Sequence, residues 1–338
     1  MKVLVVDDND VSLTMLQATL AQAGYDVETA RDGVEALDKV RRGGFRLVVS
    51  DWEMPRLDGP SLCRAIRADE LPGYVYAILV TSHHSSSEVV EGLSAGADDF
   101  VGKPFHPAEL IARVRTGERI ISLETRDVAI FAMAKLAESR DPETGAHLER
   151  VRGYCRILAR EVSTLEKFKG VVNEEFVRLI YLTSPLHDIG KVGIPDCVLL
   201  KPGRLSDQEF EVMKHHATLG AKTLEAALQT FPGIKFLEMA RDIAATHHER
   251  WDGTGYPAGI SGDRIPLSGR ITAVADVYDA LTSKRVYKDA MSHEVARSII
   301  TGESGTHFDP DVVSAFHRTQ DQFNAVRLRY SEPTAAAA

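Results

Sequence analysis

The chain has 338 residues, of which 44% are hydrophobic and 26% charged, and its net charge is −9. This composition is ordinary for a folded globular protein, the length suggests two domains, and the acidic balance disfavours a general DNA-binding surface. No apolar run approaches the roughly 18 residues of a transmembrane helix, and the early acidic residues of MKVLVVDDND are unlike a signal peptide. Cys63, Cys155 and Cys197 are widely spaced, which is typical of reduced thiols. We therefore expect a cytoplasmic protein with no membrane and no DNA partner.

Short apolar runs alternate with amphipathic stretches over residues 1–119, the first predicted domain. The predicted strands are Lys2–Val6, Val27–Thr29, Leu47–Ser50, Ala77–Thr81 and Phe100–Gly102. The predicted helices lie near residues 10–22, 34–42, 60–69 and 86–95. This alternation predicts an α/β doubly wound, five-stranded parallel sheet with helices on both faces.

Polar residues follow several of these strands. Asp7 and Asp8 follow the first strand, Asp51 follows the third, Thr81 ends the fourth and Lys103 follows the fifth. Functional groups collect at the carboxyl ends of parallel strands, and converging carboxylates need a cation such as Mg²⁺. Taken singly, the acidic pair could be a solvated turn and Lys103 a helix start. The full set favours a site where a carboxylate accepts a phosphoryl group.

The segments VVDDND, SDWEMPRLDG, ILVTSH and AGADDFVGKPF resemble the receiver domain of bacterial response regulators. The resemblance implies that Asp51 is the phosphoacceptor and that a cognate sensor histidine kinase is a partner. It implies a Mg²⁺ site formed by Asp7, Asp8, Asp51 and the carbonyl of Glu53. It also implies that Thr81, Phe100 and Lys103 are the switch residues.

A helical connector follows, because residues 107–139 contain no proline after the first position and only one glycine. Val114, Ile121 and Val128 repeat every seven residues, which allows a short coiled-coil homodimer through the 107–139 helix. Packing against the chain's own second domain is an equal alternative. We assign residues 120–139 to the connector, 140–330 to the second domain and 331–338 to a disordered tail.

Histidine–acid clusters are the main feature of residues 140–330. The predicted helices are Leu148–Val162, Glu174–Leu186, Asp207–Leu228 and Phe236–Arg250, and the clusters lie near helix ends. Imidazole with carboxylate suits divalent metals, and the ligands exceed what one tetrahedral site uses. A bridging Asp188 would hold two cations close together, an arrangement suited to phosphate esters. Neighbours on a helix point in different directions, so His215 and His216 cannot both face one site; we choose His216 and expect His215 to be partly exposed.

A second signature, DGTGYP, follows the last histidine pair. Its two glycines permit positive φ and close backbone approach, and Tyr256 could pack against a nucleobase or simply complete a tight turn. Arg285 and Lys288 could grip phosphate oxygens, or they could form a solvated basic helix end.

This half resembles the HD-GYP family of phosphohydrolases, through ETGAH, HDIGKVGIPD, HHERWDGTGYP and VADVYDALTSKRVYK. The resemblance implies a mostly helical HD-superfamily domain that binds two or three divalent metals, usually Fe or Mn. The implied ligands are Glu143, His147, His187, Asp188, His216, His247, His248 and Asp276. Lys191, Arg285, Lys288 and Tyr256 are implied or predicted to contact the substrate, with Lys191 and Asp188 the catalytic pair. His215 and Val286 depart from the family pattern, and Val286 puts in doubt how Arg285 and Lys288 are presented.

Together the two resemblances imply a response regulator whose output is hydrolysis of cyclic di-GMP to pGpG or GMP. Retention of both Glu143 and His147 favours three metals. Two alternatives stay open. One is a catalytically weak sensor of cyclic di-GMP that signals through protein partners, and the other is a phosphodiesterase for another cyclic dinucleotide.

Overall fold

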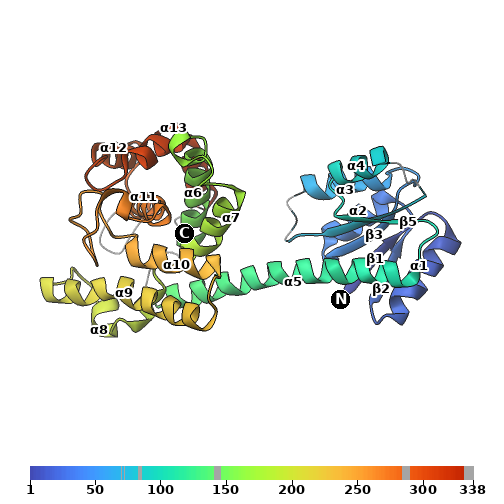
Figure 1. Ribbon diagram of the computed structural model, residues 1–338, viewed down its shortest axis with the longest axis horizontal. Helices are drawn as coiled ribbons and strands as arrows, with labels where there is room; N and C mark the ends of the chain where they lie inside the picture. Colours follow the sequence, from blue (N-terminus) through green and yellow to red (C-terminus); the bar gives the residue numbers. More distant parts are fainter. Residues whose placement is uncertain (70, 72, 83–85, 141–145, 284–289, 331–338) are drawn as a thin grey trace, which may run out of the picture. The chain divides into compact units, whose positions relative to one another are not determined.

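The computed structural model describes residues 1–330, apart from 70, 72, 83–85, 141–145 and 284–289. The chain divides into two compact units, Met1–Ala129 and Ile130–Ala338. The predicted tail at 331–338 lies outside the described residues. No helix in the described part of the chain is both long and apolar enough to cross a membrane. Figure 1 labels the elements of both units.

The first unit is a parallel sheet with helices on both faces, as predicted. Its strands are β1 Lys2–Val6, β2 Asp26–Ala30, β3 Leu47–Asp51, β4 Tyr76–Thr81 and β5 Asp99–Gly102, in the order β2-β1-β3-β4-β5. Its first four helices are α1 Asp10–Gln22, α2 Gly33–Arg42, α3 Gly59–Ala68 and α4 Ser86–Ser94. One core on the sheet includes Leu16 and Val114, from α1 and from helix α5 (Pro107–Glu138), and the other includes Val40 and Leu62, from α2 and α3.

The strand register brings the carboxyl ends of β1, β3 and β4 to one edge. Val6 pairs with Ser50, and Asp51 pairs with Val80. The loop residues that follow β1 and β3 therefore start from neighbouring positions. Asn9 then caps α1, because its side chain accepts hydrogen bonds from two backbone N–H groups of the first turn.

Helix α5 spans Pro107–Glu138. In its first half, Val114 and Ile121 are buried in the core of the first unit, so these two residues of the predicted seam are covered by the chain itself. The third seam residue, Val128, is 63% exposed. In its last turns, Phe131 and Ala134 pack in a cluster of the second unit. The helix therefore contributes to a core in each unit, rather than to the second domain alone.

The second unit is helical in the described residues outside its turns and loops. Its helices are α6 His147–Val162, α7 Glu174–Thr183, α8 Asp196–Leu199, α9 Asp207–Thr230, α10 Lys235–Thr246, α11 Leu267–Thr282, α12 His293–Gly302 and α13 Pro310–Arg329. The main core joins α6, α7, α11 and α13 through residues such as Tyr154, Tyr278 and Phe323.

Two predicted helices end earlier than expected. Helix α7 ends at Thr183, and a 3-10 turn, Ser184–Leu186, follows it. The α-helix ends there because Pro185 has no N–H to donate to the preceding turn. Helix α10 stops at Thr246 instead of reaching Arg250, and Glu249 N–H bonds to the carbonyl of Thr246 in a tight turn. Both early ends fall at histidine clusters.

Candidate metal centre and phosphorylation site

The His187-Asp188 pair lies at the break after α7, between two 3-10 turns. The second turn packs directly on α9. A Cβ at Gly190 would come within 1.9 Å of the carbonyl oxygen of His216, so only glycine allows this approach. Gly190 therefore brings the pair next to His216, which is buried, while the neighbouring His215 is exposed as predicted.

The His247-His248 pair follows the end of α10, where the DGTGYP loop folds back over it. Gly253 has a φ of +85°, which favours glycine, and a Cβ on Gly255 would lie 2.6 Å from the carbonyl oxygen of His248. Tyr256 N–H donates to that same carbonyl at 3.2 Å. Gly253 therefore provides the predicted positive φ, and Gly255 provides the predicted close backbone approach.

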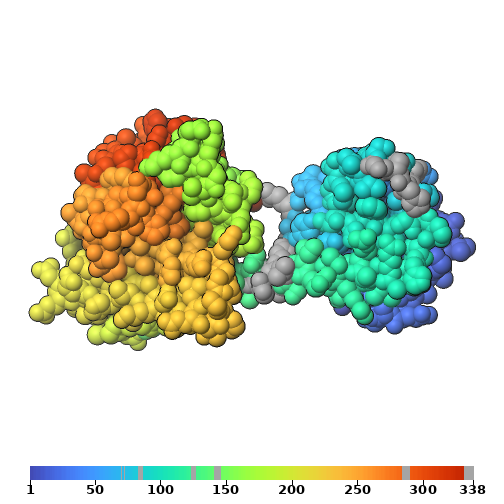
Figure 2. Space-filling view, viewed as in Figure 1, coloured from blue at the N-terminus to red at the C-terminus, as the bar shows by residue number. Residues whose placement is uncertain are grey.

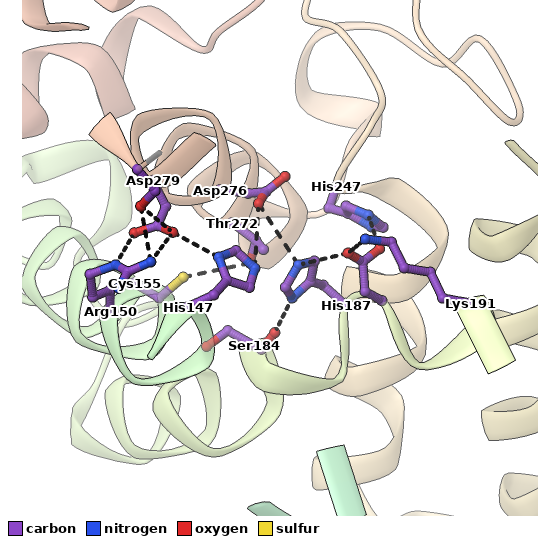
Figure 3. A network of polar contacts seen from close by, with 12 residues as sticks. His147, Arg150, Cys155, Ser184, His187, Lys191, His247, Thr272, Asp276 and Asp279 are labelled. Atoms are coloured by element: carbon purple, nitrogen blue, oxygen red, sulfur yellow. Dashed lines mark hydrogen bonds and ion pairs between the residues drawn. The ribbon is translucent and has the colours of Figure 1, made fainter. Parts of the chain in front are cut away.

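Seven candidate ligands come together in two groups: five lie at helix ends or just beyond them, as predicted, whereas His216 and Asp276 project from the middle of α9 and α11. One group contains Asp188, His216, His247 and His248, and the other contains His147, His187 and Asp276. Within each group the potential ligand atoms all lie within 4.8 Å of one another. Asp276 projects from α11 between two imidazoles, 3.8 Å from His147 Nε2 and 3.9 Å from His187 Nε2 (Figure 3).

The carboxylate of Asp188 lies between the two groups. Its Oδ2 is 3.4 Å from His187 Nε2, while its Oδ1 is 3.2 Å from His216 Nε2 and 3.6 Å from His247 Nε2. Lys191 Nζ lies 2.8 Å from Asp188 Oδ2. One carboxylate thus presents an oxygen to each group.

The imidazoles are oriented by contacts to their Nδ1 atoms. The partners are Asp279 Oδ2 for His147 at 2.8 Å, and backbone carbonyls for the others: Ser184 for His187 at 2.8 Å, Met213 for His216 at 2.7 Å and Ile243 for His247 at 3.0 Å. An Nδ1–H that donates to an oxygen leaves the Nε2 lone pair available for a metal. All four rings therefore present their ligand atom to the site.

The donor atoms fit divalent cations. Within the part of the chain that the structure describes, His187 Nε2 and Asp188 Oδ1 are buried without a hydrogen-bond partner, and such atoms are costly unless a cation satisfies them. Burial lowers the pKa of His216 to about 4, which keeps the ring neutral. Although burial opposes it, Lys191 and His187 hold the pKa of Asp188 well below its usual range. His216 and Asp188 are therefore in the protonation states that bind metals. Although burial opposes it, Asp188 and Asp276 raise the pKa of His187 to about 9, so that ring must release a proton when a cation binds.

A buried ion pair behind His147 escaped the sequence reasoning as a functional element. Arg150 donates to both carboxylate oxygens of Asp279, Nε to Oδ1 at 2.6 Å and an Nη to Oδ2 at 2.9 Å. The same guanidinium donates to Ser283 Oγ at 2.9 Å. Arg150 lies three residues after the candidate ligand His147, and Asp279 lies three residues after the candidate ligand Asp276. This spacing was the sequence feature that could have indicated the pair.

Three predicted site residues, Glu143, Arg285 and Lys288, lie outside the described residues. Tyr256 is placed at the site: its ring stacks on His248, with centroids 4.7 Å apart and planes at 29°. His307 has a structural contact instead, since its Nδ1 lies 2.7 Å from Glu303 Oε2.

The first unit holds a smaller acidic site at the carboxyl ends of its strands. Ligand atoms of Asp7, Asp8 and Asp51 lie within 4.8 Å of one another. Lys103 Nζ is 2.8 Å from Asp51 Oδ1 and 3.1 Å from Asp7 Oδ2. Burial raises the pKa of Asp51, against the effect of Lys103. Glu53, whose carbonyl is the predicted Mg²⁺ ligand, lies in the loop after β3.

The predicted switch residues also lie near this edge. Thr81 ends β4, and Phe100 lies in β5, where it pairs with Leu79. Thr81 and Phe100 line the same small pocket, together with Val89 and Leu93 of α4. A movement of the Thr81 side chain would therefore alter the pocket that the Phe100 ring also lines.

Comparison with known proteins finds a separate family match for each of the two units. Residues 3–115 match the response regulator receiver domain, and residues 132–312 match the HD domain. A probable cyclic di-GMP phosphodiesterase of Vibrio cholerae is 38% identical over 99% of this chain and 81% of its own length. The cyclic di-GMP phosphodiesterase response regulator RpfG of Xanthomonas campestris is 34% identical over 99% of this chain and 92% of its own length. A 3'3'-cGAMP-specific phosphodiesterase 2 of Vibrio cholerae is 42% identical over 60% of this chain and 37% of its own length.

Proposed function

The chain belongs to the HD-domain family, with a response regulator receiver domain at its N-terminus, and we propose that it hydrolyses cyclic di-GMP under the control of Asp51 phosphorylation. The observation that carries the proposal is the pair of adjacent ligand groups, with one oxygen of the Asp188 carboxylate facing each group. Two cations held side by side can clamp the attacking and leaving oxygens of a phosphodiester. Two relatives that each match 99% of this chain have cyclic di-GMP phosphodiesterase in their names.

The metals are proposed to be Fe or Mn, because a mixture of imidazole and carboxylate ligands suits both. His216, His247, His248 and Asp188 would hold one ion. His147, His187 and Asp276 would hold the next, with Asp188 bridging. We propose that a third ion would need Glu143 as a ligand in addition to His147. The proposed number of metal ions per chain is therefore two or three.

When bound, the cations would polarise the phosphoryl oxygens and make a water molecule a better nucleophile. The chain's own residues do the positioning. The Lys191 ammonium, held by Asp188 at 2.8 Å, would contact a phosphate oxygen or protonate the leaving 3′-oxygen. Arg285 and Lys288 are proposed to bind the second phosphate. The first product would be linear pGpG, and GMP would follow when the linear form rebinds.

A second candidate is hydrolysis of a mixed guanine–adenine cyclic dinucleotide. It is favoured by the 42% identity to the phosphodiesterase named as specific for 3'3'-cGAMP. A third candidate, a weak sensor that signals through partners, is disfavoured by the seven ligands that the described residues assemble.

The receiver is proposed to bind Mg²⁺ through Asp7, Asp8, Asp51 and the Glu53 carbonyl, and to accept phosphate from a sensor histidine kinase. Thr81, Lys103 and Phe100 would then register the phosphoryl group, and residues 120–139 would connect the two halves. Dimerisation through α5 is also a proposal, supported by exposed apolar residues such as Val128. We propose a cytoplasmic location without DNA binding, supported by the free thiols and the net charge of −9.

The test is turnover of a substrate panel by protein purified anaerobically and supplied with Fe²⁺ or Mn²⁺. Cyclic di-GMP, 3'3'-cGAMP and cyclic di-AMP are compared at equal concentration, with products separated by chromatography. Cyclic di-GMP should have the highest kcat/KM and give pGpG first. Preference for 3'3'-cGAMP would favour the second candidate, and binding without turnover of any substrate would favour the sensor.

A further inference from the structure

An aromatic side chain with a large exposed fraction lies at the edge of the metal centre. Phe210, in the first turn of α9, is 44% exposed. Its ring centroid lies 6.2 Å from that of Tyr256, with the planes at 82°. Tyr256 in turn stacks on His248 and lies 6.4 Å from the ring of His216. A series of rings therefore leads from two candidate metal ligands to an exposed aromatic side chain.

A cation accompanies these rings. Lys214, one turn after Phe210 on α9, places its ammonium 5.1 Å from the Phe210 centroid and 5.5 Å from that of Tyr256. The same ammonium bonds to Glu211 Oε1 at 2.7 Å. Figure 2 shows α9, drawn in yellow, at the surface of the second unit. The rings and the ammonium together form what we call the α9 shelf: Phe210, Lys214 and Tyr256.

We propose that the α9 shelf binds one nucleobase of the substrate, which stacks on Phe210 while the scissile phosphate lies at the metal centre. The proposal rests on the proposed function, because it takes the substrate to be a cyclic dinucleotide. A nucleotide whose phosphate contacts the imidazoles carries its ribose and base outward, and Phe210 is an exposed ring beside Tyr256, which stacks on one of those imidazoles. Base stacking on aromatic rings combined with a nearby cation is a general mode of nucleotide binding.

The division of roles among the three side chains follows from their burial. Tyr256 is partly buried, and one face of its ring is covered by His248, so it supports the shelf and positions that imidazole. Phe210 offers the exposed surface. The Lys214 ammonium adds positive charge beside the bound base. Since every base has a π-face, the shelf adds affinity without separating guanine from adenine.

The experiment measures binding of a hydrolysis-resistant phosphorothioate analogue of cyclic di-GMP to the metal-loaded, full-length protein, with metals counted in every variant. Phe210→Ala should bind about 5- to 140-fold more weakly, the range that loss of one stacking ring gives. KM for cyclic di-GMP should rise with kcat largely retained. Phe210→Trp should bind at least as tightly as the wild type.

Phe231→Ala is the matched control, because Phe231 is an exposed phenylalanine (59%) at the other end of the same helix. Its binding should equal that of the wild type. Wild-type binding by Phe210→Ala, or equally weak binding by Phe210→Ala and Phe210→Trp with metals retained, overturns the shelf and leaves the phosphodiesterase intact. A metal-loaded wild type that neither binds nor cleaves any cyclic dinucleotide overturns the proposed function and the shelf with it.

Discussion

Removing Arg150 should destabilise the second unit strongly. The side chains of Arg150 and Asp279 are only 5% and 2% exposed, and the guanidinium contacts both carboxylate oxygens. Breaking a buried pair by truncating one partner leaves a buried charge uncompensated, which costs about 3–5 kcal/mol. Arg150→Met should therefore lower the free energy of unfolding by that amount. The double variant Arg150→Met, Asp279→Leu should recover most of the loss, since neither charge is then left alone.

The assay is urea unfolding followed by tryptophan fluorescence. The chain has one tryptophan in each unit, Trp52 and Trp251, so a Trp52→Phe background leaves Trp251 as the reporter of the second unit. Asp279→Asn adds a functional readout, because the carboxylate that orients His147 is lost and metal affinity should fall by about 10- to 100-fold. The burial argument is refuted if the free energy of unfolding of Arg150→Met lies within about 1 kcal/mol of the wild-type value, since the expected decrease is at least about three times larger.

Three further predictions concern the metals, the receiver and pH. The double variant His187→Ala, Asp188→Ala should lose metal by elemental analysis and nearly all turnover, and wild-type hydrolysis with the fold intact would show the metal mechanism to be wrong. With beryllofluoride and Mg²⁺, turnover should change modestly, more in the direction of an increase, and Asp51→Asn should abolish that response while basal activity stays; a change in neither turnover nor oligomeric state would contradict receiver control. Although burial opposes it, Arg56 and backbone N–H groups hold the pKa of Asp32 below its usual range. The stability this gives is present above the unfolded pKa of about 3.9 and is lost as the pH falls through the folded pKa. In Asp32→Asn the urea unfolding midpoint of the first unit should therefore decrease less as the pH is lowered than it does in the wild type. An equal decrease in both proteins would disprove this role.

The fold class followed from local patterns. Strand–helix alternation predicts the parallel sheet because the period of apolar residues reports burial on one or both faces. The candidate ligands could also be identified from the sequence, because histidines such as His187 and His216 recur there in clusters, several of them with adjacent acidic residues. The angular separation of adjacent helix positions showed that His215 and His216 could not both face the site, and the structure has His216 buried and His215 exposed.

What the sequence could not provide depends on contacts between distant segments. The Arg150–Asp279 pair joins positions 129 residues apart, and no local pattern reports such a pairing. The heptad spacing in α5 allowed either a short coiled-coil seam or packing against the second domain, but Val114 and Ile121 are buried in the first unit while Val128 is exposed. Helical periodicity shows that a face is apolar without showing what covers it.

The most direct test of the central claim is a metal titration of the metal-free, full-length protein that records bound metal and cyclic di-GMP hydrolysis in the same samples. Because the proposed reaction needs two ions, one on each side of the Asp188 carboxylate, activity should stay near zero while the first ion per chain binds and rise as the second ion binds. Full turnover with a single ion per chain, or turnover in protein shown to hold no metal, would contradict the account.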